Sequence, residues 1–419
     1  MGTRSLWVGL HRYVGLALAG FLIIAGVTGS LLAWNDELEA FVSPQLFRVA
    51  APSPDARRLD PLVIRERLQA AYPHALALRV PLAQEPGRAL LFMLRSAPGG
   101  AHRTAQALPN DQVFVDPYTG RVLGERKWGD LSQGMKNLMP FIYRLHYSLA
   151  LGVVGTIGFG IVALLWTIDC FVGAYLTLPA KSHRTHRMAA TRRRRPWLVR
   201  WWPAWTLRRS GGYRLNVDLH RAGGLWTWAM LFVLAWSSVA FNLPQVYEPA
   251  MKAAFAHQPG LESLPRLAVP RPEPALAWAD ALSSARRLMA QQAHEHGFEV
   301  HAEKALIYDP VRGLYRYDVR SSRDVRSPGG NTRMAMDGAS GAFKGLWLPT
   351  GAASGDTIKT WLTNLHMASM WGWPMKLFLC VLGLVVTVLS VTGVVIWERK
   401  RRARGSASTT RHMRRARAL

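Results

Sequence analysis

The sequence predicts an α-helical integral membrane protein with four transmembrane helices, two external α+β domains and a tandem internal repeat. Long apolar runs, an uneven distribution of positive charge and motifs that occur twice in the same order lead to this fold class. Of the 419 residues, 49% are hydrophobic, and they are gathered in long runs. This clustering is typical of a membrane protein, because a soluble core spreads its apolar residues periodically along the chain.

Four apolar runs reach the length of about 20 residues that a helix needs to cross a bilayer core about 30 Å thick. They are Val14 to Trp34, Leu149 to Leu178, Leu225 to Leu243 and Leu377 to Trp397. The first run is too long for the apolar part of a signal peptide, and no small-residue cleavage site follows it. We therefore expect four permanent transmembrane helices.

The formal net charge of +26 is concentrated in two segments. Lys181 to Arg214 holds 11 basic residues and no acidic one, and the tail from Glu398 holds 9 against one. Asn35 to Pro140 has 13 basic and 11 acidic residues, and Pro244 to Leu365 has 14 basic and 12 acidic residues. The positive-inside rule places the central loop and both termini in the cytoplasm and the near-neutral segments outside. Basic runs beside helix ends also meet anionic membrane lipid, so nucleic acid is not expected as a partner.

These features predict eight consecutive segments. Residues 1–34, 141–180, 220–243 and 366–398 are the transmembrane helices, 35–140 and 244–365 the external domains, 181–219 the cytoplasmic loop and 399–419 the cytoplasmic tail. In the first domain we expect a helix over 60–73 and strands within 75–83, 89–96 and 112–126. In the second we expect a linker over 257–275, a helix over 274–293 and strands within 305–321 and 332–345.

Three motifs occur twice. H-R-x-x-G-L begins at His11 and again at His220, an offset of 209 residues. L-H-x5-G, which contains His146 and His366, recurs after 220 residues, and D-x-x-[TS]-G-x3-G at Asp116 recurs after 221. The common order and spacing predict a tandem repeat of helix, external domain and helix.

Topology sorts the four repeated histidines into two pairs. His11 and His220 begin helices that leave the cytoplasm, whereas His146 and His366 begin helices that return from outside. A pair at each end of a four-helix bundle suits bis-imidazole ligation of haem, with one axial ligand from each facing helix. We therefore expect these four to be metal ligands of two b-type haems. The only cysteines lie inside apolar runs, which excludes a cysteine-based metal site.

Residues near the inner histidines could complete such a site. Gly15 and Gly224 lie one helical turn after the histidines, where a missing side chain lets a flat macrocycle approach the backbone. Arg12 and Arg221 could pair with haem propionates, although an arginine at a cytoplasmic helix end needs no ligand to explain it. Asp169 lies inside an apolar run, which favours either a proton-transfer role or a buried hydrogen bond.

The repeated H-R-x-x-G-L opening, the segment "VFVDPYTGRVLG" and the L-H return helix resemble the PepSY-associated transmembrane family of bacterial inner-membrane proteins. The resemblance covers nearly the whole chain. It implies periplasmic PepSY-like domains and a link to iron acquisition, because some members resemble iron-regulated ferric-siderophore reductases with two b-type haems. The haem ligands by matching motif are His11, His146, His220 and His366. Two departures are the lack of a fused flavin reductase domain and "DGASG" in place of "DPYTG" in the second copy.

These features favour an inner-membrane oxidoreductase that takes electrons from a cytoplasmic donor or quinol and reduces a periplasmic ferric siderophore or other ferric chelate. No protein side chain is expected to act as a catalytic acid or base. A transporter for the chelate or another solute is the second interpretation, because repeated halves can form a pathway. The third is a PepSY-type regulatory scaffold without haem, in which the four histidines could be replaced without loss of function.

Overall fold

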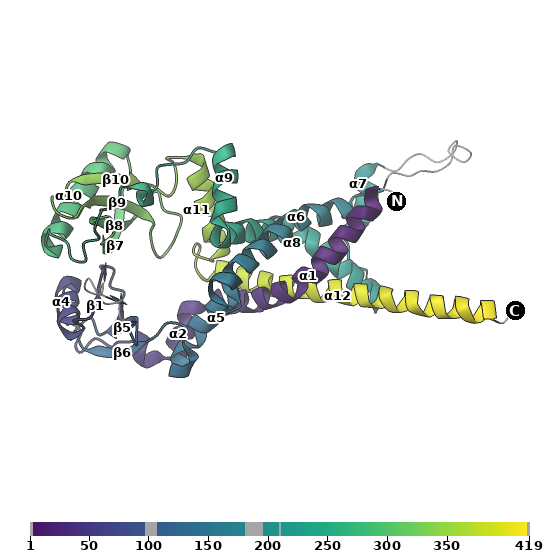
Figure 1. Cartoon of the computed structure of the whole chain (residues 1–419), viewed down its shortest axis with the longest axis horizontal. Coiled ribbons are helices and arrows are strands. Elements are labelled where there is room, and N and C mark those ends of the chain that lie inside the picture. Colours follow the sequence, from purple (N-terminus) through teal and green to yellow (C-terminus); the bar gives the residue numbers. More distant parts are fainter. Residues whose placement is uncertain (1–2, 97–106, 181–195, 209–210, 417–419) are drawn as a thin grey trace. The chain divides into compact units, whose positions relative to one another are not determined.

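The computed structural model describes residues 3–96, 107–180, 196–208 and 211–416, with side chains as far as residue 404. The chain forms two compact units (Figure 1). The helical unit comprises Met1–Ala33, Leu145–Glu248 and Lys376–Leu419. The sheet unit comprises Trp34–Arg144 and Pro249–Met375.

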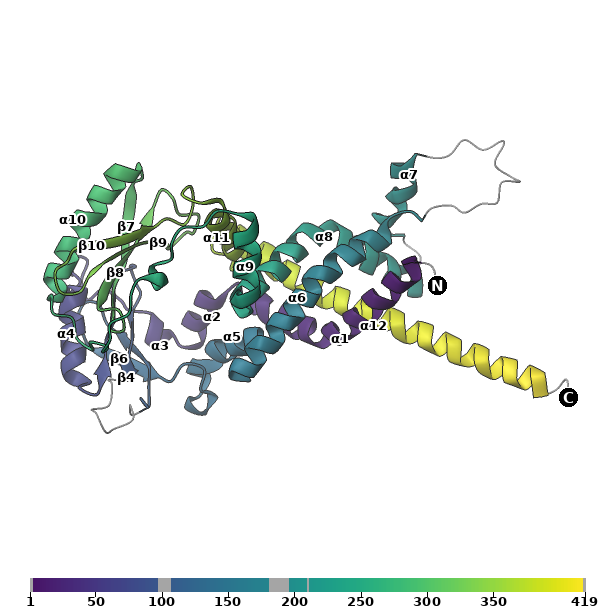
Figure 2. The same cartoon turned by 45° about the horizontal axis from the view of Figure 1, so that its top comes forward.

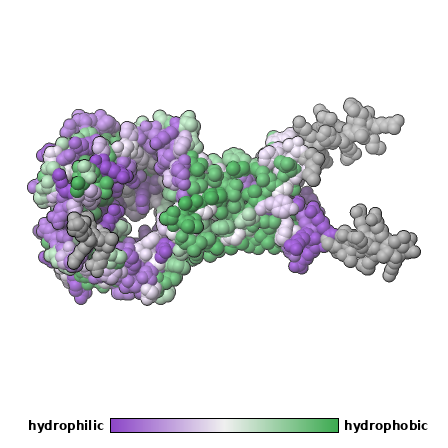
Figure 3. All heavy atoms as spheres, in the orientation of Figure 1, coloured by the Kyte–Doolittle hydropathy of each residue, from purple (hydrophilic) through white to green (hydrophobic). Residues whose placement is uncertain are grey.

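Four long helices form the helical unit: α1 (Thr3–Leu32), α6 (Gly152–Thr177), α8 (Tyr213–Asn242) and α12 (Trp373–Ala416). Within the described residues these are the helices long and apolar enough to cross a membrane, as predicted from the four apolar runs. Their outward side chains are mostly apolar, and Figure 3 shows hydrophobic surface gathered over them. A surface of this kind is suited to lipid.

Small residues bring α1 and α12 close together. A side chain on Gly26 would lie 2.5 Å from the carbonyl oxygen of Gly383, so the two backbones touch there. The Ser30 hydroxyl lies 2.8 Å from the carbonyl oxygen of Cys380, to which it donates a hydrogen bond. Close approach at glycine and hydrogen bonding by serine are common between membrane helices, where lipid removes the hydrophobic drive for helix association.

The prediction that His146 and His366 begin the returning helices is wrong. His146 lies in α5 (Leu138–Ser148), and His366 is the last residue of α11 (Ser354–His366). Each helix ends before α6 or α12 begins, because the intervening backbone turns left-handed. The left-handed residues are Leu149, Ala150 and Gly152 in the first break and Ala368, Trp371 and Gly372 in the second. Only the glycines adopt this conformation without a steric cost.

A five-stranded sheet in the order β10-β9-β8-β7-β2 is the centre of the sheet unit. Its strands are β2 (Arg79–Pro81), β7 (Val300–Asp309), β8 (Leu314–Ser321), β9 (Thr332–Asp337) and β10 (Phe343–Trp347). Helix α10 (Trp278–His296) covers one face, as Figure 2 shows, and shares a buried core with it. Ala281, Ala285 and Met289 of α10 are each at most 1% exposed, as expected for the apolar side of a helix on a sheet.

A smaller second core lies beside α4 (Pro61–Ala71), where β3 (Leu90–Met93), β5 (Gln112–Val115) and β6 (Val122–Arg126) form a three-stranded sheet. A two-stranded sheet pairs β1 (Ala75–Leu76) with β4 (Arg95–Ser96). The remaining short elements are α2 (Asn35–Val42), α3 (Pro44–Phe47), η1 (Leu131–Gln133), η2 (Met135–Asn137), α7 (Trp197–Trp201), η4 (Trp202–Ala204), α9 (Pro244–Ala254) and η5 (Leu261–Ser263).

The two segments predicted as separate external domains share one sheet. Strand β2, from the first segment, pairs antiparallel with β7 of the second through Arg79 with Ile307 and Val80 with Leu306. Leu62 and Leu78 of the first segment also belong to the core that α10 covers. Apolar burial therefore joins the two segments, which are distant in sequence.

The two D-x-x-[TS]-G motifs form the same kind of hairpin turn. Asp116 accepts hydrogen bonds from the backbone N–H groups of Tyr118 and Thr119, and Gly120 has a φ of 73°. Asp337 accepts from Ala339 and Ser340, and Gly341 has a φ of 71°. These backbone bonds lower the pKa of Asp337 to about 2, because they stabilise the carboxylate. The predicted positive φ of Gly120 is confirmed.

Candidate functional site

The four long helices line a cavity of about 340 Å³. Its lining includes all six residues predicted around the inner pair: His11, Arg12, Gly15, His220, Arg221 and Gly224. Residues of α6 and α12, such as Asp169 and Gly393, complete the lining. The volume lies within the range of about 300–1,000 Å³ found for small-molecule and cofactor sites. The site therefore contains the first H-R-x-x-G-L motif and its second copy.

His11 is held by the carboxylate of Asp169. The Nδ1 atom of His11 lies 2.8 Å from Oδ1 of Asp169, whose side chain is 11% exposed. A carboxylate oxygen only accepts, so Nδ1 of the imidazole is the donor of this hydrogen bond. This arrangement assigns the hydrogen-bond role expected for Asp169 and leaves the second ring nitrogen of His11 for a ligand.

His220 is held in the same way by the backbone of α12. Its Nδ1 lies 2.9 Å from the carbonyl oxygen of Leu389 and 3.2 Å from the Thr392 hydroxyl oxygen. The carbonyl can only accept, and Thr392 already donates to Val388 and Leu389. Nδ1 of His220 is therefore the donor, and its Nε2 is the ring nitrogen left for a ligand.

The two imidazoles are spaced as one metal between them would require. Their ring centroids lie 6.1 Å apart with an angle of 55° between the planes. A metal–nitrogen distance of about 2 Å on each side, and about 1 Å from each nitrogen to its ring centre, gives centroids about 6 Å apart. Two imidazoles oriented by hydrogen bonds at Nδ1 fit the donor set of bis-histidine haem ligation.

Glycines make room on both sides of each imidazole. A side chain on Gly173 of α6 would lie 3.4 Å from Cε1 of His11, and one on Gly393 of α12 would lie 3.2 Å from Cε1 of His220. On the cavity side, a side chain on Gly15 or Gly224 would have no atom within 4 Å and would extend into open space. A flat ligand can therefore approach the backbone there, as the sequence suggested.

Gly173, Gly393 and Leu389 were missed by the sequence interpretation. Gly173 and Gly393 are separated by 220 residues, the offset of the L-H-x5-G motif, and this regularity could have identified the glycines. Leu389 acts through its carbonyl group, which every residue type carries. No side-chain pattern could have pointed to it.

Both predicted arginines line the cavity, and their surroundings differ. The Arg221 Nη2 atom donates to the carbonyl oxygen of Pro203 and to Asp218, each at 2.7 Å. These bonds explain Arg221 as a structural residue of α8. Arg12 contributes its side chain to the cavity lining, where the positive charge is suited to an acidic substituent on a ligand.

Of the predicted outer pair, His146 lies in the helical unit. Its Nδ1 lies 3.0 Å from the Thr28 hydroxyl oxygen, and a side chain on Gly29 would lie 3.1 Å from its Cε1. Thr28 already donates to the carbonyl oxygen of Ile24, so Nδ1 of His146 is again the donor. His146 thus has the same kind of support as His11 and His220. His366 belongs to the sheet unit, at the end of α11.

Metal chelation by three or more side chains is not found in the described part of the chain. Among those residues, no group of three or more His, Cys, Asp or Glu side chains is placed to hold a metal ion. Cys170 and Cys380 are free thiols. Paired imidazoles are therefore the arrangement that this cavity presents.

A comparison with protein families agrees with the motif resemblance. The model of the PepSY-associated TM region matches residues 8–400, and it therefore covers all four histidines. No curated protein is significantly similar to the sequence. The four candidate membrane helices and the additional β-sheets fit a membrane protein with PepSY-like domains. The chain belongs to the family of the PepSY-associated TM region.

Proposed function

We propose that this protein is an inner-membrane electron-transfer protein that holds two b-type haems and reduces a ferric chelate on the periplasmic side. The observation that carries the proposal is the pair of His11 and His220, with centroids 6.1 Å apart beside a cavity. The Nδ1 bonds of these histidines to Asp169 and Leu389 leave both Nε2 atoms for one metal.

The distribution of charge supports the orientation. Four spans place both ends of the chain on the same side, and the basic segments 181–219 and 399–419 favour the cytoplasm. The sheet unit, which carries the near-neutral segments, is then periplasmic. The electron donor is a cytoplasmic reductant or a quinol, and the basic segments contact anionic lipid.

The repeat supports a second site. His146 and His366 are separated by 220 residues, and His146 is oriented through Nδ1 like the inner pair. We assign these two histidines to the outer haem. The inner and outer pairs would then use one histidine from each half of the tandem repeat, which gives an electron path from one side of the membrane to the other.

The haem would supply one-electron transfer, and the chain would set its ligation and surroundings. His11 and His220 would hold the haem iron, and Arg12 would pair with an acidic substituent of the haem. Apolar lining residues such as Leu18 and Leu231 would exclude water. Reduction would release iron, because the hard oxygen ligands of a siderophore suit Fe(III) much better than Fe(II).

The first test is the reduced-minus-oxidised visible spectrum of the detergent-purified full chain, with haem quantified per chain. We expect sharp low-spin bands of b-type haem at about two haems per chain, because four histidines form two pairs. A protein that stays colourless after expression with ample haem would exclude this function. The transporter or the regulatory scaffold would then be the better interpretation.

Replacing Asp169→Asn tests the carboxylate that orients His11. We expect haem to remain bound and the midpoint potential of the inner haem to rise, because the neutral amide makes His11 a weaker electron donor. A tenfold change in the relative affinity for ferric over ferrous iron corresponds to about 59 mV in a one-electron couple. Spectropotentiometry measures this shift, and the outer haem serves as an internal reference. An unchanged inner potential would show that Asp169 does not act on the ligand.

A further inference from the structure

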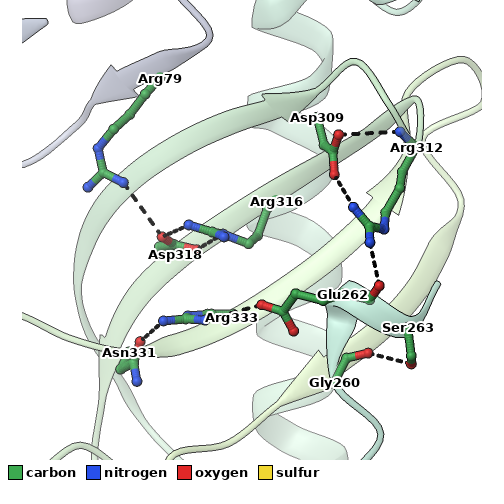
Figure 4. A network of polar contacts seen from close by, with 10 residues as sticks. All are labelled: Arg79, Gly260, Glu262, Ser263, Asp309, Arg312, Arg316, Asp318, Asn331 and Arg333. Atoms are coloured by element: carbon green, nitrogen blue, oxygen red, sulfur yellow. Dashed lines mark hydrogen bonds and ion pairs between the residues drawn. The ribbon is translucent and has the colours of Figure 1, made fainter. Parts of the chain in front are cut away.

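The five-stranded sheet carries a cluster of arginines on the face opposite α10. Cross-strand register aligns Arg79 of β2 with Ile307, and Ile307 with Arg316 of β8. In the next row, Asp318 of β8 aligns with Arg333 of β9. Figure 4 shows the side chains of Arg79, Arg316, Asp318 and Arg333 on one side of the sheet. The residues that alternate with them along β8 and β9 belong to the core that α10 covers.

Carboxylates on this face are fewer than the arginines. Asp318 receives Nε and Nη2 of Arg316 at 2.8 and 3.0 Å, and Nη1 of Arg79 lies 3.9 Å away. One carboxylate therefore serves two guanidinium groups. Nη1 of Arg333 lies 3.8 Å from Glu262, whose side chain is 71% exposed, so this pair contributes little neutralisation.

Further cations increase the excess of positive charge. Arg320 follows Asp318 by two residues on β8 and so lies on the same face. Within the described part of the chain, its buried Nε has no hydrogen-bond partner. On β7, the pKa of Lys304 is lowered by burial and then by repulsion from Arg326. Burial also lowers the pKa of Arg79, more than Asp318 raises it. The local carboxylates therefore leave this charge uncompensated.

The arginines remain accessible to a small ligand. The side chains of Arg79, Arg316 and Arg333 are 39%, 33% and 31% exposed, so each guanidinium group is partly surrounded and still open. A planar guanidinium group matches a carboxylate with two parallel bonds, as Asp318 and Arg316 already demonstrate.

We propose that the arginine face, formed by Arg79, Arg316, Arg320 and Arg333, binds a small anion with two or more carboxylate groups. One carboxylate bonds to the exposed part of the Arg320 guanidinium group, and another bonds to Arg333. The site depends on the sheet alone and is independent of haem binding. If the proposed reductase function also holds, its substrates include ferric complexes of polycarboxylates.

The test is calorimetric titration of citrate into the purified full chain at low and high NaCl. We expect binding at low salt that weakens as NaCl rises. Arg320→Gln and Arg333→Gln should each raise the Kd about tenfold or more, because a charge-assisted hydrogen bond is lost. Arg287→Gln is the matched control. It removes one positive charge from an exposed position on α10, on the other side of the sheet, and should leave the Kd unchanged.

Three results would overturn the proposal: no citrate binding by the wild-type chain, equal affinity in the variants, or tighter binding of inorganic phosphate than of citrate. Thermal unfolding of each variant checks that the sheet is intact. Arg316 is left unchanged because Asp318 is 8% exposed and would lose its bidentate partner. Haem content, measured on the same samples by absorbance, keeps a failure of this site distinct from a failure of the proposed function.

Discussion

In the proposed two-haem protein, the double replacement of His11→Ala and His220→Ala is expected to lower the haem content from two per chain to one. The two imidazoles, whose centroids lie 6.1 Å apart, are the only pair of predicted ligands that line the cavity. Alanine offers no ligand, so the inner haem should not bind, and the outer site should keep its low-spin spectrum. Haem extraction with quantification per chain, together with the visible spectrum, measures both outcomes.

His301→Ala is a suitable control for this experiment. His301 is 42% exposed on β7 of the sheet unit, and its replacement should leave two haems per chain. If the double variant lost both haems while remaining folded, or lost neither, the assignment of His11 and His220 to one haem would be wrong. Single replacements should each give the same loss as the double, because one imidazole alone does not complete the pair.

Arg126→Met is expected to destabilise the sheet unit by about 3–5 kcal/mol, the usual cost of removing one partner of a buried ion pair. Arg126 is 2% exposed, and its Nη1 lies 2.8 Å from Oε1 of Glu39. It also donates to Gln112 and to the carbonyl oxygen of Lys136. For a domain of this size the loss corresponds to a fall in melting temperature of about 10 °C, measurable by circular dichroism on the full chain.

The destabilisation caused by Arg126→Met should also depend on pH. Burial already raises the pKa of Glu39, and Arg126 opposes that rise. Without the arginine the folded-state pKa rises further above the unfolded value, so protonated Glu39 favours folding at low pH, and this stability is lost as pH rises through the folded pKa. The deficit of Arg126→Met should therefore be smaller at mildly acidic pH than at neutral pH.

Two further variants distinguish the ion pair from general damage. Arg121→Met, at an exposed position in the turn before β6, should change the melting temperature by about 2 °C or less. Adding Glu39→Leu to Arg126→Met should recover much of the loss, because no carboxylate remains buried without a partner. If Arg126→Met alone melted at the same temperature as the wild-type chain, a stabilising role of this ion pair would be contradicted.

Much of the helical unit could be predicted from the sequence because its signals, the length and hydrophobicity of continuous runs, come from neighbouring residues. The run from Leu225 to Leu243 alone identified α8 as a candidate span, and the helix extends it at the N-terminal end to Tyr213. The inner site followed from one motif and its copy, since H-R-x-x-G-L places His11 and Gly15 one turn apart on the same helix.

The breaks next to His146 and His366 could not be predicted in this way. Leu149 and Ala150 adopt left-handed backbone, a conformation that neither residue type prefers. Only the glycines that follow, Gly152 and Gly372, hinted at it. The pairing of β2 with β7 was also hidden, because it joins Arg79 to Ile307 across more than half of the chain.

The sequence by itself therefore determined the four apolar helices, the basic segments, the hairpin turns of Asp116 and Asp337 and the family of the chain. The tertiary structure decided which atoms hold the functional side chains. Asp169 lies 158 residues from His11, and Leu389 lies 169 residues from His220. Length, charge and turn preference depend on neighbouring residues, whereas these contacts depend on how separate helices pack, which local patterns do not encode.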